Sequence, residues 1–240
     1  MEGFRKFLDF FLDLLFPPKC LLCKRLNSNL ICPECLSQLT PFRGKTCSLC
    51  GVPLEGKDNR CPQCLRNPPY FDRGFFYGLY QGKLEEAILR FKYQDHPGLS
   101  APLGKLLAEK FRETGVQVDL VTWVPLHQRK LKMRGYNQAE LLARAISVNL
   151  GLPYGDLLIK KKETKPQSRL SREERLKNVI GVFKPKSAVE LQGKSLLLVD
   201  DVVTTGATAS ECARVLKEMG AEKVFVLSLA RGTGTQRPIS

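Results

Sequence analysis

The sequence predicts an α/β protein, a parallel sheet with flanking helices, preceded by a small N-terminal metal-binding module. Residues 71–231 alternate short apolar runs with segments of helical periodicity, as the strands and helices of such a sheet require. Eight of the nine cysteines fall within residues 20–64, arranged in pairs. One apolar run ends in two adjacent aspartates and a turn of threonines and glycine. With 240 residues, 43% of them hydrophobic, the chain is long enough for one or two domains with a buried core.

The first 18 residues have the pattern of an amphipathic helix. Pro17 and Pro18 end the pattern, because proline cannot continue a helix. Asp9 and Asp13 interrupt the apolar centre that a signal peptide needs, and the chain has no run of about 18 apolar residues. We therefore expect a cytoplasmic protein with no membrane span. The helix either packs on its own protein, which is the simpler interpretation, or docks a partner. Its apolar face consists of Phe4, Phe7, Leu8, Phe11, Leu12 and Leu15.

The α/β region shows strands and helices in alternation. Gly151 and Gly220 follow two of the helical patterns, as glycine commonly does where a helix ends. The last strand, helix and strand form a βαβ unit, which implies a parallel sheet. In chain order the expected strands are residues 73–80, 120–124, 196–199 and 224–229, and the expected helices are residues 84–91, 99–113, 139–150 and 207–219.

The cysteine pairs predict two structural Zn²⁺ ions within residues 19–68. A two-residue gap lets both thiolates of a pair face one tetrahedral ion, and four thiolates close a zinc site. Short gaps of eight and ten residues make sequential pairing simplest, although interleaved pairing stays open. Such a polar segment lacks a core of its own, so zinc would supply its folding free energy. The expected ligands are Cys20, Cys23, Cys32, Cys35, Cys47, Cys50, Cys61 and Cys64.

A redox role for the paired cysteines carries less weight, and the ninth cysteine is separate from them. A redox motif of the thioredoxin type expects one pair rather than four. Cys212 stands alone inside a predicted helix and is interpreted as an inert buried thiol. The zinc module itself is a scaffold, a protein dock or a nucleic-acid contact, and the sequence does not choose among these.

The most informative motif covers residues 196–208. A buried strand delivers Asp200 and Asp201 to its C-terminal end, where open α/β sheets bind ligands. Adjacent carboxylates can accept hydrogen bonds from the vicinal hydroxyls of a ribose. The threonine–glycine turn and the following helix N-terminus direct donors into one small space, which suits a phosphate. An ordinary acidic turn with a threonine N-cap is the alternative.

This segment resembles the phosphoribosyl diphosphate (PRPP) binding motif of type I phosphoribosyltransferases. The whole chain is similar to the ComF family, which is associated with competence and DNA uptake in bacteria. The resemblance covers nearly the full length and includes the four cysteine pairs. Its other parts are Phe91-Lys92-Tyr93, Val124-Pro125-Leu126-His127, Arg134-Gly135-Tyr136-Asn137-Gln138, Gln167-Ser168, Leu170-Ser171 and Arg175-Leu176-Lys177-Asn178.

The resemblance implies a type I phosphoribosyltransferase-like domain over residues 71–240. Asp200 and Asp201 would bind the ribose hydroxyls, and the turn after Val124-Pro125 would lie near the diphosphate. Mg²⁺ would accompany PRPP and offset its charge. The residues expected to cradle the 5-phosphate are Thr204, Thr205, Gly206, Ala207 and Thr208.

Two functions follow from this resemblance. The first is a phosphoribosyltransferase that displaces diphosphate from PRPP. The second is a binding module that holds single-stranded DNA, or docks a DNA-translocating helicase, during natural transformation or DNA repair. The tail after residues 224–229 is short and polar, so the acceptor pocket stays unassigned, with the space under the zinc module as one place for it.

Positive charge is concentrated in two segments of this chain, whose net charge is +14. Residues 127–134 hold four basic residues and no acid, and residues 160–177 hold eight basic and three acidic residues. Arg134 and Lys92 are the candidate catalytic residues, Arg134 because a cation beside the flexible Gly135 can approach a departing diphosphate.

These segments also have other interpretations. Arg169, Arg172 and Arg175 resemble a lid over the ligand. Both segments also fit solvated loops, or a DNA-backbone contact in which Tyr93 or Tyr136 stacks on a base. His96 and His127 have no partner spacing typical of a metal site or a triad.

Overall fold

The computed structural model describes residues 17–94, 96–162, 179–187 and 189–232. Two expectations lie outside these residues: the helix over residues 1–18, apart from its last two residues, and the lid containing Arg169, Arg172 and Arg175. Within the described ranges, every helix is too short or too polar to cross a lipid bilayer.

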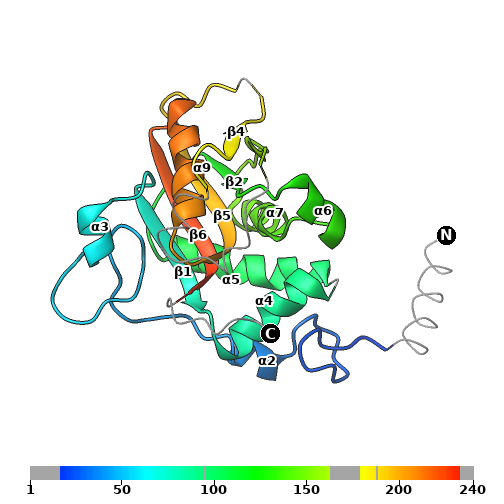
Figure 1. Ribbon diagram of the computed structural model, residues 1–240. Coiled ribbons are helices and arrows are strands. Elements are labelled where there is room, and N and C mark those ends of the chain that lie inside the picture. Colours follow the sequence, from blue (N-terminus) through cyan, green and yellow to red (C-terminus); the bar gives the residue numbers. More distant parts are fainter. Residues whose placement is uncertain (1–16, 95, 163–178, 188, 233–240) are drawn as a thin grey trace.

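A four-stranded sheet forms the centre of the molecule (Figure 1). Its order is β1-β6-β5-β2 and every pair is parallel, which confirms the predicted βαβ unit. The strands are β1 (Arg73–Leu79), β2 (Leu120–Trp123), β5 (Ser195–Val203) and β6 (Lys223–Arg231).

Helices cover both faces of this sheet, which explains why β5 begins with a continuous apolar run from Leu196 to Val199. Along β5, Leu197 and Val199 pack toward one face, and Leu196 and Leu198 toward the other. The first face carries α4 (Gly82–Tyr93), α5 (Ser100–Arg112) and α7 (Gln138–Leu150), and the second carries α9 (Ala207–Glu218) with the β3–β4 hairpin.

Three elements differ from the prediction. Strand β5 extends beyond the expected residues 196–199, through both aspartates to Val203, so the carboxylates project from a hydrogen-bonded strand. The basic segment that begins at His127 is a helix, α6 (Gln128–Arg134), ended by Gly135 at φ 76°. An antiparallel hairpin, β3 (Leu158–Lys160) with β4 (Phe183–Pro185), was not predicted, because strands of three residues are too short to show a period.

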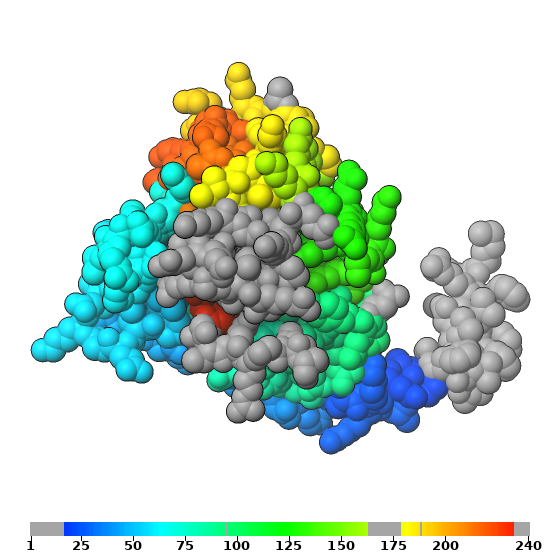
Figure 2. Space-filling model, in the orientation of Figure 1, coloured from blue at the N-terminus to red at the C-terminus, as the bar shows by residue number. Residues whose placement is uncertain are grey.

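The cysteine-rich region forms two ribbons, each with one short helix (Figure 1). The first ribbon, residues 19–39, contains α2 (Pro33–Ser37) and contacts a 3₁₀ turn, η1 (Pro97–Leu99), that follows α4. The second ribbon, residues 46–67, contains α3 (Pro62–Arg66) and packs on the edge strand β1. In Figure 2 the first ribbon is blue, and the second, light blue to cyan, lies at the opposite side of the body.

Candidate functional site

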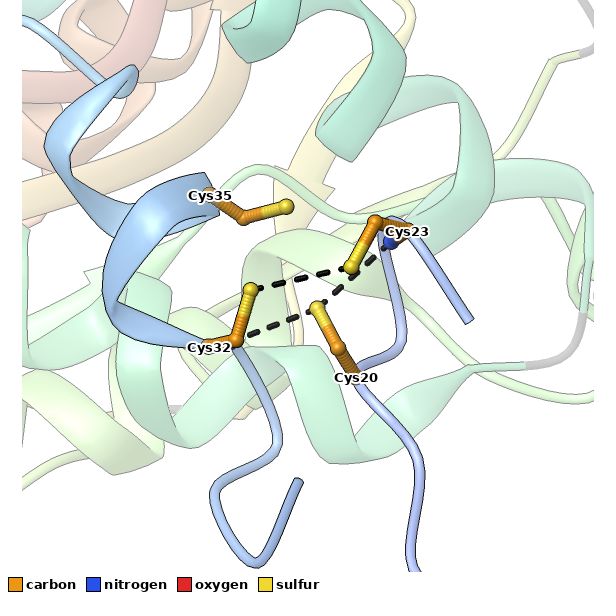
Figure 3. Close-up of side chains that lie close together, drawn as sticks. All are labelled: Cys20, Cys23, Cys32 and Cys35. Carbon is orange, nitrogen blue, oxygen red and sulfur yellow. Dashed lines mark hydrogen bonds between the residues drawn. The ribbon is translucent and has the colours of Figure 1, made fainter. Parts of the chain in front are cut away.

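Each ribbon gathers four cysteine sulfurs into one cluster. Within each cluster the sulfur atoms all lie within 4.8 Å of one another, and Figure 3 shows the first set facing a common centre. The clusters join sequential pairs, which resolves the pairing that the sequence left open. They are Cys20, Cys23, Cys32 and Cys35 in the first ribbon, and Cys47, Cys50, Cys61 and Cys64 in the second.

The local chemistry of these clusters fits Zn²⁺. Backbone N–H groups of Leu22, Cys23 and Cys32 donate to the sulfur of Cys20 at 3.3–3.5 Å. Burial disfavours this thiolate, but these donors prevail and lower the pKa of Cys20 to about 6. In the second cluster burial and the neighbouring charge of Cys47 raise the pKa of Cys50 to about 11, against the backbone N–H of Val52 and the charge of Arg231. A divalent cation at the centre would let all four thiols ionise together.

All of the predicted ligand residues except Thr205 line a cavity of 210 Å³ at the C-terminal edge of the sheet, and Thr205 faces a neighbouring pocket instead. This edge is where ligands of open parallel sheets bind. Both aspartates lie at this cavity and are half-buried, rather than turned into the core. The lining includes Lys92, Lys130, Arg134, Lys160, Asp200, Asp201, Thr204, Gly206, Ala207 and Thr208.

The two carboxylates differ in their surroundings because neighbouring strand residues point to opposite faces of a sheet. Asp201 shares the face of α4, and its Oδ1 lies 3.0 Å from the Nζ of Lys92. Asp200 lies on the α9 side, where burial and then the charge of Asp201 raise its pKa to about 7. Lys92, Lys160 and the backbone N–H of Asp201 oppose that rise. The cavity therefore holds one ion-paired carboxylate beside one that exchanges a proton near neutral pH.

The turn between β5 and α9 leads directly into the N-terminus of a helix. Gly206 adopts φ 82° as the N-cap of α9, a conformation that glycine reaches without strain. It has no side chain that could cap the helix, and the Oγ1 of Thr205 accepts the N–H of Ala207 at 3.3 Å. Thr208 and Ala209 of the first turn line the cavity, so the N-terminal end of α9, where the helix dipole is positive, lies beside it.

Arg134 and Lys92, the candidate catalytic residues, both line this cavity. The Nη2 of Arg134 donates to the hydroxyl of Tyr93 at 3.1 Å, and its guanidinium lies 4.8 Å from the Tyr93 ring centre. Its Nη1 donates to Oε1 of Gln138 at 3.2 Å. These contacts hold the cation at the border between the cavity and a wider groove beside Tyr93.

Two residues of the site were missed from the sequence. Asn137 is buried, donates to the carbonyl of Val124 at 3.1 Å and accepts the N–H of Ala139, so it joins the turn after β2 to α7. Its place before a helix was a readable N-cap signal. Lys160 reaches the cavity from β3, and nothing in a long basic run distinguished it from its neighbours.

The remaining candidates lie in structural positions. The hydroxyl of Tyr136 donates to the carbonyl of Phe91 at 2.7 Å, and its partly buried ring packs against the core. His127 caps α6 by accepting the N–H of Arg129, and His96 lies 3.1 Å from the Nζ of Lys24. Cys212 is fully buried, and burial raises the pKa of its thiol well above the ordinary value, as an inert thiol requires.

Family models match both parts of the chain. A double zinc ribbon domain matches residues 11–65. A phosphoribosyl transferase domain matches residues 131–240. Together with the two four-cysteine clusters and the parallel sheet, these matches establish the predicted fold class.

Curated relatives match along nearly the whole chain. Competence protein F of Haemophilus influenzae is 32% identical over 223 residues, which cover 89% of this chain and 96% of the relative. DNA utilization protein YhgH of Escherichia coli K12 is 33% identical over 227 residues, covering 91% of this chain and 99% of the relative.

Among solved structures, the glutamine PRPP amidotransferase of B. subtilis is 24% identical with a TM-score of 0.40. That similarity covers 59% of this chain and 30% of the other. A TM-score of this size does not by itself establish a shared fold, which here follows from the topology and the family matches.

Proposed function

The chain belongs to the family of competence protein F and DNA utilization protein YhgH, and from that membership we propose that it binds PRPP, as a phosphoribosyltransferase-like protein of DNA uptake. The observation that carries this proposal is the juxtaposition of two acceptors for ribose hydroxyls with an anion-binding turn in one cavity. Asp200 and Asp201 would accept hydrogen bonds from the ribose hydroxyls. Residues 204–208 would bind the 5-phosphate through their N–H and hydroxyl groups.

The cations of the cavity suit the diphosphate of the same ligand. Lys92, Lys130 and Arg134 line one side, and Lys160 reaches in from the hairpin. In a transfer reaction the bond from the anomeric carbon to the diphosphate oxygen breaks, and a bond forms from that carbon to the acceptor. The charge that develops on the departing diphosphate is stabilised by these cations, which are already in place. Bound Mg²⁺ would add further positive charge at the diphosphate oxygens.

Isothermal titration calorimetry with PRPP and Mg²⁺ tests this proposal. We expect the wild type to bind and the double variant Asp200→Asn with Asp201→Asn to lose at least about tenfold in affinity, because hydrogen bonds to charged groups are strong. Asp58→Asn, which removes an exposed carboxylate from the second ribbon, is the matched control and should bind like the wild type. Absence of binding by the wild type would remove the proposal. A search for products with nucleobase and amine acceptors then decides whether transfer occurs.

A second candidate function, single-stranded DNA binding, rests on a different feature. A groove of 700 Å³ adjoins the cavity, and no acid is among its lining residues. Tyr93 and Met133 are 61% and 79% exposed there, so a base could stack between phosphate-binding cations. The lining residues are Lys92, Tyr93, Arg129, Lys130, Met133, Arg134 and Gly135.

Fluorescence anisotropy with a labelled oligonucleotide at several salt concentrations tests this second function. Arg129→Gln should weaken binding and reduce the dependence of log affinity on log salt concentration by about 0.7, as expected for one lost phosphate contact. Lys217→Gln, which removes a cation from α9, is the control. No binding even at low salt would exclude the function.

A further inference from the structure

Each ribbon is connected to the ligand cavity through its own series of packed residues, which forms a route of contacts from the ribbon to the cavity. The first ribbon contacts α4, whose last turn carries Lys92. The second ribbon contacts β1 and the segment before it, residues 70–72, which lies against α9. One route therefore ends at the carboxylates, and the other at the phosphate-binding turn.

The route from the first ribbon runs through a continuous buried cluster. Cys20, Cys32 and Cys35 are buried in one core cluster with the inward face of α4, which consists of Leu84, Ala87, Ile88 and Phe91. At the end of α4, the carbonyl of Phe91 accepts the hydroxyl of Tyr136 at 2.7 Å. The backbone beside Lys92 is therefore fixed by the ribbon and by the start of α7. Lys92 then places its Nζ 3.0 Å from Asp201.

The route from the second ribbon begins with backbone packing. The N–H of Gly74 donates to the carbonyl of Leu49 at 2.7 Å, and a methyl group on Gly51 would lie 2.6 Å from the carbonyl oxygen of Gly74. No side chain fits between these two segments. The second ribbon is thus docked directly on the N-terminal end of β1.

The segment before β1 completes this second route. Phe71 is buried, and its ring lies 3.8 Å from the position of a methyl group on Gly206. The N–H of Tyr70 donates to the Oγ of Ser210 at 3.0 Å, within the first turn of α9. The ring therefore supports the phosphate-binding turn from the side of the second ribbon.

We propose that the two zinc ribbons act on separate halves of the ligand: the first positions Lys92 and with it the diol-binding Asp201, and the second positions Phe71 under the phosphate-binding turn. Phe71 is then a positioning residue, and Lys92 adds the positioning of Asp201 to its place in the cavity lining; each depends on its own ribbon. Zinc binding supplies folding free energy to a ribbon, so loss of one ion loosens one route and leaves the other. The inference rests on the proposed sugar-phosphate site.

Two sugar phosphates separate the halves experimentally. Ribose 5-phosphate carries the hydroxyl at carbon 2, and 2-deoxyribose 5-phosphate lacks it. The ratio of their dissociation constants measures recognition of that hydroxyl, whereas a common loss of affinity measures the phosphate. We expect wild-type protein to prefer the ribose compound by about tenfold or more, because its hydroxyl meets charged acceptors.

Matched variants remove one zinc site at a time. Cys35 and Cys64 occupy the third position of α2 and of α3, so Cys35→Ser and Cys64→Ser are equivalent changes. Cys35→Ser should bring the ratio close to one. Cys64→Ser should weaken both compounds by a similar factor of about ten and keep the ratio. Zinc analysis by mass spectrometry should find one ion per chain in each variant and two in the wild type.

A second pair of variants keeps both zinc ions, in case a serine variant fails to fold. Lys92→Met should lower the ratio, and Phe71→Leu should weaken both compounds alike. If the wild type binds but the two variants of either pair change the ratio of dissociation constants in the same way, the division between the ribbons is wrong. If the wild type binds neither compound, the sugar-phosphate site itself is wrong, and this inference falls with it.

Discussion

The two ribbons have the same ligand pattern but different relations to the rest of the protein. In the first, three cysteines belong to the main hydrophobic core, together with residues of α4, α5 and the sheet. In the second, Cys47, Cys61 and Cys64 form a small cluster of their own, supported by partly buried neighbours such as Leu49 and Leu54. The cysteine spacing specifies the metal site, whereas the apolar residues around it decide how much of the fold depends on that metal.

The largest predicted effect is the difference in stability between the two zinc sites. Because the first cluster is continuous with the core, Cys35→Ser should lower the global free energy of unfolding by on the order of 5 kcal/mol. Cys64→Ser should change it by less than about 2 kcal/mol and should open only the second ribbon. Urea denaturation measures the first quantity, and amide hydrogen exchange locates the opening. Equal global losses would contradict the comparison.

A core substitution beside each ribbon sharpens the same contrast. Ile88 is fully buried in the core cluster that includes the cysteines of the first ribbon, so Ile88→Ala should cost about 4 kcal/mol of unfolding free energy. Leu54 is only partly buried beside the second ribbon, and Leu54→Ala should cost less than about 1.5 kcal/mol. Denaturation curves of both variants check this. A larger cost at Leu54 would mean that the second ribbon, rather than the first, is continuous with the main core.

The contact between the second ribbon and β1 can be tested by adding a single methyl group. Gly51→Ala should cost about 2–3 kcal/mol of local stability, because the new methyl group meets the carbonyl oxygen of Gly74 and the residue has φ 72°. Gly56→Ala is the matched control, since Gly56 has φ 83° but open space around it, and should cost about 1 kcal/mol. Hydrogen exchange within residues 46–67 reports both. Similar exchange in the two variants would show that the contact with β1 is not what holds this ribbon.

The smallest predicted effect concerns the pH dependence contributed by Asp200. Its pKa of about 7 exceeds the ordinary value of 3.8, so the folded protein holds this proton more tightly than the unfolded chain. The stabilisation is complete below about pH 4 and is lost as the pH rises through 7. Between about pH 5 and about pH 7.5 the wild type should lose about 2 kcal/mol through this group. The unfolding free energy of Asp200→Asn, measured by urea denaturation, should not show that loss. Parallel pH profiles of variant and wild type would refute the contribution of Asp200.

The sequence revealed the site wherever its residues are local in the chain. Asp200, Asp201 and the following turn lie on consecutive elements, so one strand–turn–helix pattern placed them at one edge. The zinc ligands were equally readable because each pair spans a tight turn. These predictions needed no knowledge of distant contacts.

What the sequence could not provide were contacts between distant segments. Lys92 was a candidate without an assigned partner, and its ion pair with Asp201 depends on how α4 packs across the sheet. Lys160 was indistinguishable within a basic run until the short β3–β4 hairpin placed it at the cavity. Tyr93 and Tyr136 looked equivalent, and only packing shows that one is exposed and the other tied to Phe91.

The most direct test of the sugar-phosphate site is a titration of ¹⁵N-labelled protein with ribose 5-phosphate, followed by the amide resonances. If residues 204–208 bind the phosphate, their backbone N–H signals should show the largest shifts, with smaller shifts at Asp200 and Asp201. Shifts confined to α6, with the resonances of residues 204–208 unmoved at saturation, would contradict the proposed site.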